Sequence, residues 1–172
     1  MAKRDPNDKR NFVIVGSGIA GLVAAETLRQ SGYTGKITMI NGEKALPYDR
    51  TLMTKQLTEV TAQGLTLRDK QWFQDAEIDM VHDKVYSIHP DIKKLAMEHG
   101  EAISYDKLLI ATGGSVRKTT LPGADAHNVF YLRTSEDQAA IKARAEEIKD
   151  GVAVIGAGFI GTETASALVL KY

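Results

Sequence analysis

Two glycine-rich segments have the spacing that holds the pyrophosphate of a dinucleotide. The first is Gly16-Ser17-Gly18-Ile19-Ala20-Gly21 and the second is Gly156-Ala157-Gly158-Phe159-Ile160-Gly161. In this pattern the first glycine makes a tight turn, the second lets the backbone approach the pyrophosphate, and the third lets a helix pack closely on a strand. The N-terminus of that helix then faces the phosphates. One such motif is weak evidence, but two indicate two nucleotides, one of which passes electrons to the other.

Each glycine segment follows an apolar run that is typical of a strand. We expect residues 12–16 to form a buried strand, and the run over 152–155 to form a parallel strand that stays exposed over 151–155 and leaves apolar surface for a partner. We expect a helix over 18–31 and a second strand over 36–40, which completes a βαβ unit of the size that the fingerprint requires. Only 11 residues follow Gly161. The second nucleotide domain therefore lacks its second strand and acidic residue, and we expect no NAD(P)H binding by this chain alone.

The remaining pattern predicts an α/β fold. We expect a Rossmann-like FAD-binding domain, made of a parallel sheet with helices and a small antiparallel β-meander, followed by the first strand, turn and helix of a truncated NAD-binding domain. A short helix should follow the connection over 45–57, and 68–75 is helical at best. The other expected elements are parallel strands over 78–82 and 107–111, meander strands over 85–88, 94–97 and 102–105, and a helix over 135–149.

Composition excludes several classes of protein. Lys plus Arg and Asp plus Glu number 22 each, so no charge excess points to nucleic acid. No apolar run approaches the roughly 20 residues that span a bilayer. There is no cysteine, which excludes a disulfide scaffold and a thiol nucleophile, so redox chemistry requires a bound cofactor. Residues 1–11 form a charged segment without an apolar core, which predicts a solvated tail, no targeting signal and an intracellular location, cytoplasmic or mitochondrial.

Five motifs in register carry a family resemblance. They are the first glycine segment, Leu-Pro-Tyr-Asp-Arg-Thr-Leu-Met-Thr-Lys, Tyr-Asp-Lys-Leu-Leu-Ile-Ala-Thr-Gly-Gly, Tyr-Leu-Arg-Thr-Ser-Glu-Asp-Gln-Ala-Ala-Ile, and Val-Ala-Val-Ile-Gly-Ala-Gly-Phe-Ile-Gly-Thr-Glu. The chain resembles the flavin-dependent pyridine nucleotide oxidoreductases of the ferredoxin reductase and apoptosis-inducing-factor group. It looks closest to the apoptosis-inducing-factor 3-like branch. The resemblance covers residues 12–171 and implies an N-terminal portion of such an enzyme.

The resemblance assigns a role to each matching position. FAD binding falls to Gly16, Ser17, Gly18, Ala20, Gly21, Arg50, Lys55, Val85, Ala111, Thr112, Gly113 and Arg133. Lys55 and Glu163 match a pair beside the flavin, where Lys55 stabilises the reduced flavin and Glu163 orients Lys55. If the family fold forms, we expect the charged atoms of this pair to lie within about 4 Å, the reach of an ion pair.

Three departures from the family pattern matter. Gly42 stands where the family usually has an acid that binds the adenosine ribose, and Glu43 remains to do so. Its distance from Gly21 fits the offset of about 20 residues expected for that acid. Thr51 replaces a proline and Thr54 replaces a serine. The family also continues for about two hundred residues more, through the rest of the NAD domain and a C-terminal domain.

Two other residue sets suggest no site. The four histidines, His82, His89, His99 and His127, show no metal-ligand spacing and no carboxylate partner pattern, so we predict no metal site. Trp72 and Phe73 are predicted to be core or interface anchors rather than a flavin stack.

Two functions remain open, with domains over 1–11, 12–150 and 151–172 in both. In the first, the chain is the FAD-binding portion of an NAD(P)H-dependent oxidoreductase that passes electrons to an iron–sulfur protein or similar acceptor. It is not active alone, and NAD(P)H binds only if another chain supplies the missing domain. In the second, the chain is a truncated relic of such an enzyme, kept as a structural accessory subunit of a larger assembly. Both require a protein partner that covers the incomplete second domain.

Overall fold

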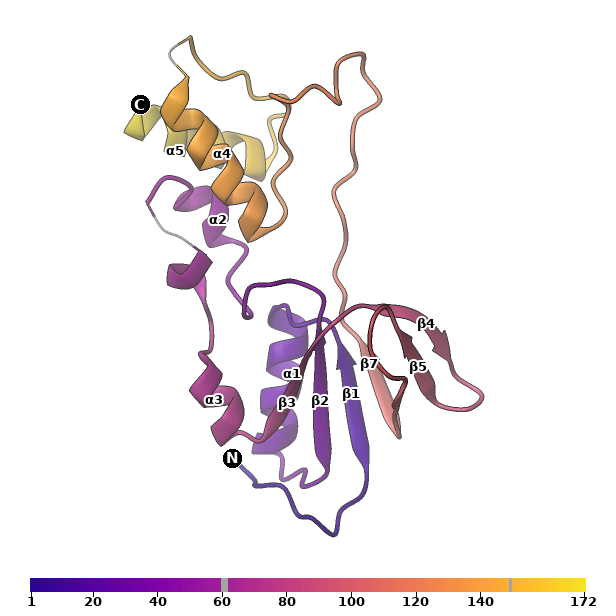
Figure 1. The fold of residues 1–172 in the computed structure, drawn as a ribbon. Coiled ribbons are helices and arrows are strands. Elements are labelled where there is room, and N and C mark those ends of the chain that lie inside the picture. Colours follow the sequence, from indigo (N-terminus) through magenta and orange to yellow (C-terminus); the bar gives the residue numbers. More distant parts are fainter. Residues whose placement is uncertain (60–61, 149) are drawn as a thin grey trace. The chain divides into compact units, whose positions relative to one another are not determined.

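The computed structural model describes residues 1–59, 62–148 and 150–172. The chain divides into two compact units (Figure 1). Unit 1 comprises Met1–Tyr48 and Thr66–Gly113, and unit 2 comprises Asp49–Leu65 and Gly114–Tyr172. No helix in the described residues is long and apolar enough to cross a membrane.

Unit 1 is built on a four-stranded parallel sheet in the order β3-β2-β1-β7. The strands are β1 (Asn11–Val15), β2 (Lys36–Asn41), β3 (Ile78–His82) and β7 (Lys107–Ile110). Helix α1 (Ile19–Gln30) connects β1 to β2, and helix α3 (Lys70–Asp75) precedes β3 (Figure 1). The predicted βαβ unit and parallel strands are thus confirmed, within one or two residues at each end.

The two faces of this sheet have different covers. Successive side chains of a strand point to opposite faces. Ile14 therefore packs with Leu22 of α1 and Phe73 of α3, whereas Val13 packs with Leu95 on the other face. That second face is covered by the antiparallel sheet of β4 (Val85–His89), β5 (Lys94–Met97) and β6 (Ile103–Ser104). The predicted meander is confirmed, as is the core position of Phe73, which is 4% exposed.

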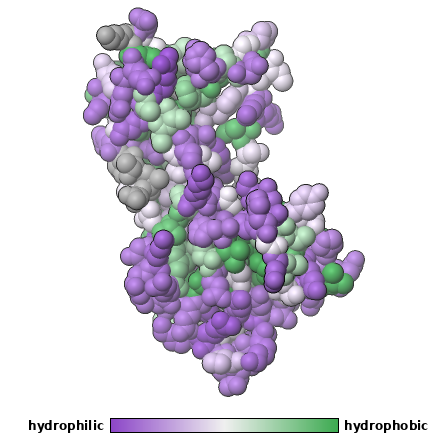
Figure 2. Space-filling model, viewed as in Figure 1, coloured by the Kyte–Doolittle hydropathy of each residue, from purple (hydrophilic) through white to green (hydrophobic). Residues whose placement is uncertain are grey.

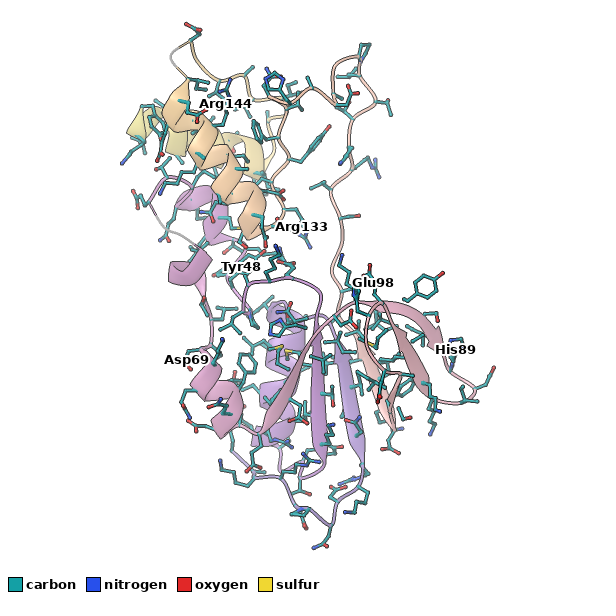
Figure 3. The ribbon with its side chains drawn as sticks, viewed as in Figure 1. Tyr48, Asp69, His89, Glu98, Arg133 and Arg144 are labelled. Atoms are coloured by element: carbon teal, nitrogen blue, oxygen red, sulfur yellow. The ribbon has the colours of Figure 1, made fainter. Side chains whose placement is uncertain are left out.

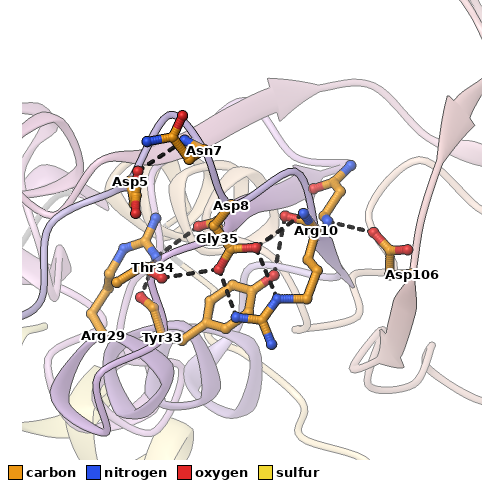
Figure 4. A network of polar contacts seen from close by, with 10 residues as sticks. Asp5, Asn7, Asp8, Arg10, Arg29, Tyr33, Thr34, Gly35 and Asp106 are labelled. Atoms are coloured by element: carbon orange, nitrogen blue, oxygen red, sulfur yellow. Dashed lines mark hydrogen bonds and ion pairs between the residues drawn. The ribbon is translucent and has the colours of Figure 1, made fainter.

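The charged N-terminal segment, predicted to be a solvated tail, is hydrogen-bonded to the rest of unit 1. The backbone N–H of Ala2 donates to the carbonyl of Arg29 at 2.8 Å, and that of Asp5 donates to the carbonyl of Thr34 at 2.9 Å. Asp8 accepts from the guanidinium of Arg10 at 2.6 and 2.8 Å and from the Thr34 hydroxyl at 2.9 Å (Figure 4). The segment is anchored because its polar groups find partners where α1 turns into β2.

Unit 2 is helical. It contains α2 (Leu52–Lys55), the 3₁₀ turn η1 (Ala62–Leu65), α4 (Ser135–Glu147) and α5 (Phe159–Lys171). Leu57, Ala145 and Leu168, from three separate segments, form its small core. Helix α4 ends two residues before the predicted end at Lys149, which lies outside the described residues.

The predicted strand over 152–155 is wrong. Residues 151–157 have no strand hydrogen bonding in the structure. A strand is stabilised by the backbone hydrogen bonds it exchanges with neighbours, and within the described residues no neighbouring strand reaches this segment. Val152 is 52% exposed and Ile155 is 86% exposed, so the predicted exposure of this apolar segment is confirmed although the strand is not. The visible face of the molecule is mostly hydrophilic, and hydrophobic residues show through it in patches (Figure 2).

Candidate nucleotide site

The first glycine segment forms a tight turn between β1 and α1. Gly16 has a φ of 105°, a conformation that side-chain-bearing residues rarely adopt. A Cβ added to Gly21 would lie 2.0 Å from the carbonyl oxygen of Gly16, so the helix can approach the turn only because residue 21 is glycine. Both glycines therefore have the structural roles that the fingerprint predicts.

Gly18 stands at the N-cap of α1 and faces open space. A Cβ built on it meets no atom within 4 Å, so glycine is not required there by the fold. The helix has no side-chain cap and no acidic residue in its first turn. Its free N–H groups and the positive end of its dipole suit an anion. The room beside Gly18 and the electrostatics of α1 both fit a diphosphate, and Ser17 and Ala20 lie in the same turn.

The end of β7 lies directly beside this turn. The N–H of Ala111 donates to the carbonyl of Val15 at 2.7 Å. A Cβ on Gly16 would lie 2.3 Å from the Ala111 carbonyl oxygen, which shows how closely the two backbones approach. Thr112 and Gly113 continue this connection, and Gly113 has a φ of 69°. The structure thus brings together Gly16 and Ala111, which lie far apart in the sequence.

Glu43 and Val85, two further predicted FAD-binding residues, both lie in unit 1. Glu43 lies just after β2, and its carboxylate accepts a hydrogen bond from the hydroxyl of Tyr48 at 2.7 Å. Val85 begins β4 and packs against the core that β1 and β2 share with the meander. Tyr48 is a residue that the sequence reasoning missed, because a tyrosine within a loop gives no spacing signal of its own.

Unit 2 brings together Lys55 of α2 and Glu163 of α5. The lysine Nζ lies 3.0 Å from Oε1 and 3.1 Å from Oε2 of Glu163, which confirms the predicted distance. The pair is partly open to solvent, since the side chains are 51% and 29% exposed. Thr54 donates its hydroxyl hydrogen bond to the same carboxylate. Hydrogen bonds from Thr54 and then Lys55 lower the pKa of Glu163, which keeps the carboxylate charged.

The two arginines of unit 2 that were predicted to bind FAD are also in contact. The guanidinium of Arg50 donates to the backbone carbonyl of Arg133 at 2.6 Å. Arg133 in turn precedes the capping box of α4, in which Thr134 and Asp137 exchange hydrogen bonds. Its own N–H donates to Asp137 at 2.9 Å. The start of α4 therefore fixes the backbone that holds Arg50.

The second glycine segment repeats the geometry of the first. Gly156 has a φ of 113°, and Gly158 stands at the N-cap of α5 in extended backbone. A Cβ on Gly161 would lie 2.1 Å from the Gly156 carbonyl oxygen, which matches the 2.0 Å of the first segment. Turn and helix form as predicted, although the strand before them does not.

One polar cluster was not expected from the sequence. Asp83, Glu98 and His99 each place one side-chain oxygen or nitrogen atom within 4.8 Å of the others. His99 Nδ1 lies 3.1 Å from Asp83 Oδ1. No spacing pattern in the sequence indicated this contact, which forms because the turn after β5 brings the exposed His99 back to Asp83. Burial opposes ionisation of Asp83, but hydrogen bonds from the Lys84 and His99 backbones, the His99 ring and Gly100 lower its pKa to about 2. These hydrogen bonds connect the turn between β3 and β4 with the turn after β5.

The chain matches known proteins over almost its whole length. Residues 10–171 match the family described as "Pyridine nucleotide-disulphide oxidoreductase". Apoptosis-inducing factor 3 of Mus musculus is 40% identical over 94% of this chain and 26% of its own length. A rubredoxin-NAD(+) reductase of Pseudomonas putida is 38% identical over 92% of this chain and 42% of its own length.

Solved structures agree with these sequence matches. The ferredoxin reductase for the CYP199A2 system from Rhodopseudomonas palustris has a TM-score of 0.90 and 38% identity, covering 95% of this chain and 41% of that one. The described fold is therefore the one found in that reductase. The chain spans roughly a quarter to two-fifths of the length of these similar proteins.

Proposed function

The chain belongs to the pyridine nucleotide-disulphide oxidoreductase family, and from this premise we propose that it is the FAD-binding portion of an NAD(P)H-dependent oxidoreductase. The observation that carries the proposal is the turn between β1 and α1. It combines a positive φ at Gly16, open space at Gly18 and a helix N-terminus without acidic residues. Together these features provide room and charge complementarity for the pyrophosphate of FAD.

The residues of this chain would bind and orient the cofactor. Bound FAD would supply the redox chemistry, accepting a hydride and releasing single electrons. The turn at Gly16–Gly21 would hold its pyrophosphate, and Glu43 would bind the adenosine ribose. The remaining positions follow from the family resemblance: Val85, Ala111, Thr112, Gly113, Arg50, Lys55 and Arg133. Of these, Lys55 would place a cation at the flavin.

Glu163 would act on Lys55 rather than on the cofactor. Its carboxylate holds the lysine Nζ at 3.0 Å and is itself held by Thr54. Because the lowered pKa keeps Glu163 charged, its carboxylate attracts the ammonium group of Lys55 and favours the observed orientation of that side chain. This supports a positioning role for Glu163, and a role for the Thr54 hydroxyl at the position where the family has serine.

The electron donor and acceptor are proposed on the relatives alone. Relatives are described as ferredoxin or rubredoxin reductases that use NAD(+), which favours NAD(P)H as donor and an iron–sulfur protein or similar carrier as acceptor. The turn at Gly156–Gly161 has the right geometry for a nucleotide but no hydrogen-bonded strand before it. We therefore expect NAD(P)H to bind only where a further polypeptide completes that fold.

One observation favours the alternative role as an accessory subunit. Ile155, Phe159 and Ile160 are 86%, 87% and 58% exposed around the second glycine turn. Exposed apolar residues gathered in this way are typical of a surface that a partner covers. A chain kept for this surface would bind its partner whether or not it holds a flavin.

A flavin measurement separates the two proposals. The purified full chain should show the absorbance bands of bound FAD, and Gly18→Val should lose them because the new side chain fills the space beside the helix N-terminus. Gly158→Val is the matched control, since a Cβ there also meets no atom within 4 Å but belongs to the second turn. Equal flavin content in both variants would refute the assignment. A chain that carries no flavin and still forms a stable complex would favour the accessory role.

A further inference from the structure

The loop after β2 has a fixed shape because of one buried side chain. Asn41 is 2% exposed. Its Oδ1 accepts a hydrogen bond from the N–H of Glu43 at 3.0 Å, and its Nδ2 donates to the carbonyl of Ala45 at 2.8 Å. An asparagine that bonds to the backbone in this way imposes a turn. The backbone of Glu43 is therefore set before any ligand arrives.

The side chain of Glu43 is held as well. The hydroxyl of Tyr48 donates to its Oε2 at 2.7 Å. Tyr48, labelled in Figure 3, is 4% exposed. Its backbone forms an antiparallel bridge with Thr66, so both the ring and the backbone of Tyr48 are held by the fold. A glutamate side chain otherwise loses much rotamer freedom when it binds a ligand. Holding it in advance reduces that cost.

The neighbouring position offers no second acid. Residue 42 is glycine, and a Cβ added there would lie 3.2 Å from Cγ of Lys84. The space that an acidic side chain would enter is thus bordered by the stem of a lysine. Of positions 42 and 43, only Glu43 can therefore offer a carboxylate to a ribose at this end of the sheet.

We propose that Tyr48 is a positioning residue that holds Glu43 so that this single carboxylate recognises the vicinal diol of the adenosine ribose. The proposal rests on the proposed function of the β1–α1 turn as a site for FAD. A carboxylate has about four acceptor positions, so a hydrogen bond from the tyrosine hydroxyl is compatible with further hydrogen bonds from a ribose. All the residues involved belong to unit 1.

The test compares ADP with 2′-deoxy-ADP, which lacks one hydroxyl of the diol. Both are titrated by calorimetry into the full chain after its flavin has been removed. A hydrogen bond to a charged group predicts that the wild type binds ADP roughly tenfold more tightly than 2′-deoxy-ADP. In Tyr48→Phe this ratio should fall below about threefold, with the affinity for 2′-deoxy-ADP nearly unchanged, because only the diol contact is impaired.

Tyr33→Phe is the matched control. Its hydroxyl bonds to the carbonyl of Arg10 at 3.2 Å, and the variant should keep the tenfold ratio. Glu43→Gln should lower the ratio as Tyr48→Phe does, and the double variant should lower it no further.

Three outcomes would overturn the proposal. An equal loss of affinity for both nucleotides in Tyr48→Phe would show a general structural role. An unchanged ratio in that variant would show that Tyr48 has no role in ribose recognition, while the proposed FAD site would still stand. A wild-type chain that binds neither ADP nor FAD would overturn the proposed function together with this inference.

Discussion

The buried arginine of α1 allows a quantitative test of what holds unit 1 together. Arg29 is fully buried, and its guanidinium donates to the backbone carbonyls of Ala76, Tyr33, Gly35 and Glu77 at 2.8–2.9 Å. It thereby joins the end of α1 to the turn between α3 and β3. Burial lowers the pKa of Arg29, although the charge of Glu77 opposes this shift.

Arg29→Met keeps much of the apolar stem and removes the donors. Hydrogen bonds from a charged group contribute about 1.5–3 kcal/mol each, so four of them amount to roughly 6–12 kcal/mol. Burying the charge costs several kcal/mol, which offsets part of this gain. We expect a net loss of about 3–5 kcal/mol in the free energy of unfolding, a large share of the 5–15 kcal/mol typical of a domain.

Urea unfolding followed by the fluorescence of Trp72 measures this loss. Trp72 is the only tryptophan of the chain and lies in unit 1, so its signal reports that unit. The control is Arg4→Met, which removes an exposed ion pair with Asp79 in the same unit and should change stability by less than about 0.5 kcal/mol. A loss below about 1 kcal/mol in Arg29→Met would refute the reasoning, since it would mean that the four carbonyls find other partners.

Three more predictions concern acidic residues and the first turn. Because the folded-state pKa of Asp83 is about 2, below its ordinary 3.8, its stabilising effect is present above pH 3.8 and is lost as the pH falls towards 2. The difference in urea midpoint between wild type and Asp83→Asn should therefore shrink between pH 7 and pH 2.5; a constant difference would contradict this. In Lys55→Met, carbon-13 NMR should show the pKa of Glu163 rising only part of the way to 4.5, because the Thr54 hydrogen bond remains; an unmoved pKa would contradict the ion pair. Gly21→Ala places a Cβ 2.0 Å from the Gly16 carbonyl oxygen and should cost about 1–3 kcal/mol in the Trp72 assay, whereas Gly18→Ala should leave that stability unchanged.

The parts of the fold that local pattern determines were predictable from the sequence. The parallel strands, α1 and the meander follow from apolar periodicity and turn residues, and the structure has them within one or two residues. The glycine turns were predictable because only glycine satisfies both the positive φ at residue 16 and the close approach at residue 21. The Lys55–Glu163 pair, 108 positions apart, was predictable only through the family resemblance.

The missed features depend on partners that sequence spacing does not reveal. The run over 152–155 has the composition of a strand, but a strand also needs a neighbour, and composition does not supply one. Tyr48 and Thr54 act through a single hydroxyl each, and such contacts depend on side-chain geometry. His99 contacts Asp83 because the turn after β5 brings the two side chains together. Their spacing in the sequence matches no metal-ligand or catalytic-triad pattern. The domain boundaries and the cofactor roles of the site residues stay predictions.

The geometry of the second glycine turn has a consequence for the energetic cost of pairing the segment before it. In the structure the turn has its full geometry without a paired strand, so this geometry does not depend on strand pairing. A sheet that later docks beside it needs to immobilise only residues 152–155. At about 1–2 kcal/mol per residue, that ordering costs roughly 4–8 kcal/mol, which burial of the exposed Val152 and Ile155 would help to offset. Docking of such a sheet would therefore require ordering of this short segment only, while the glycine turn and α5 keep the geometry they already have.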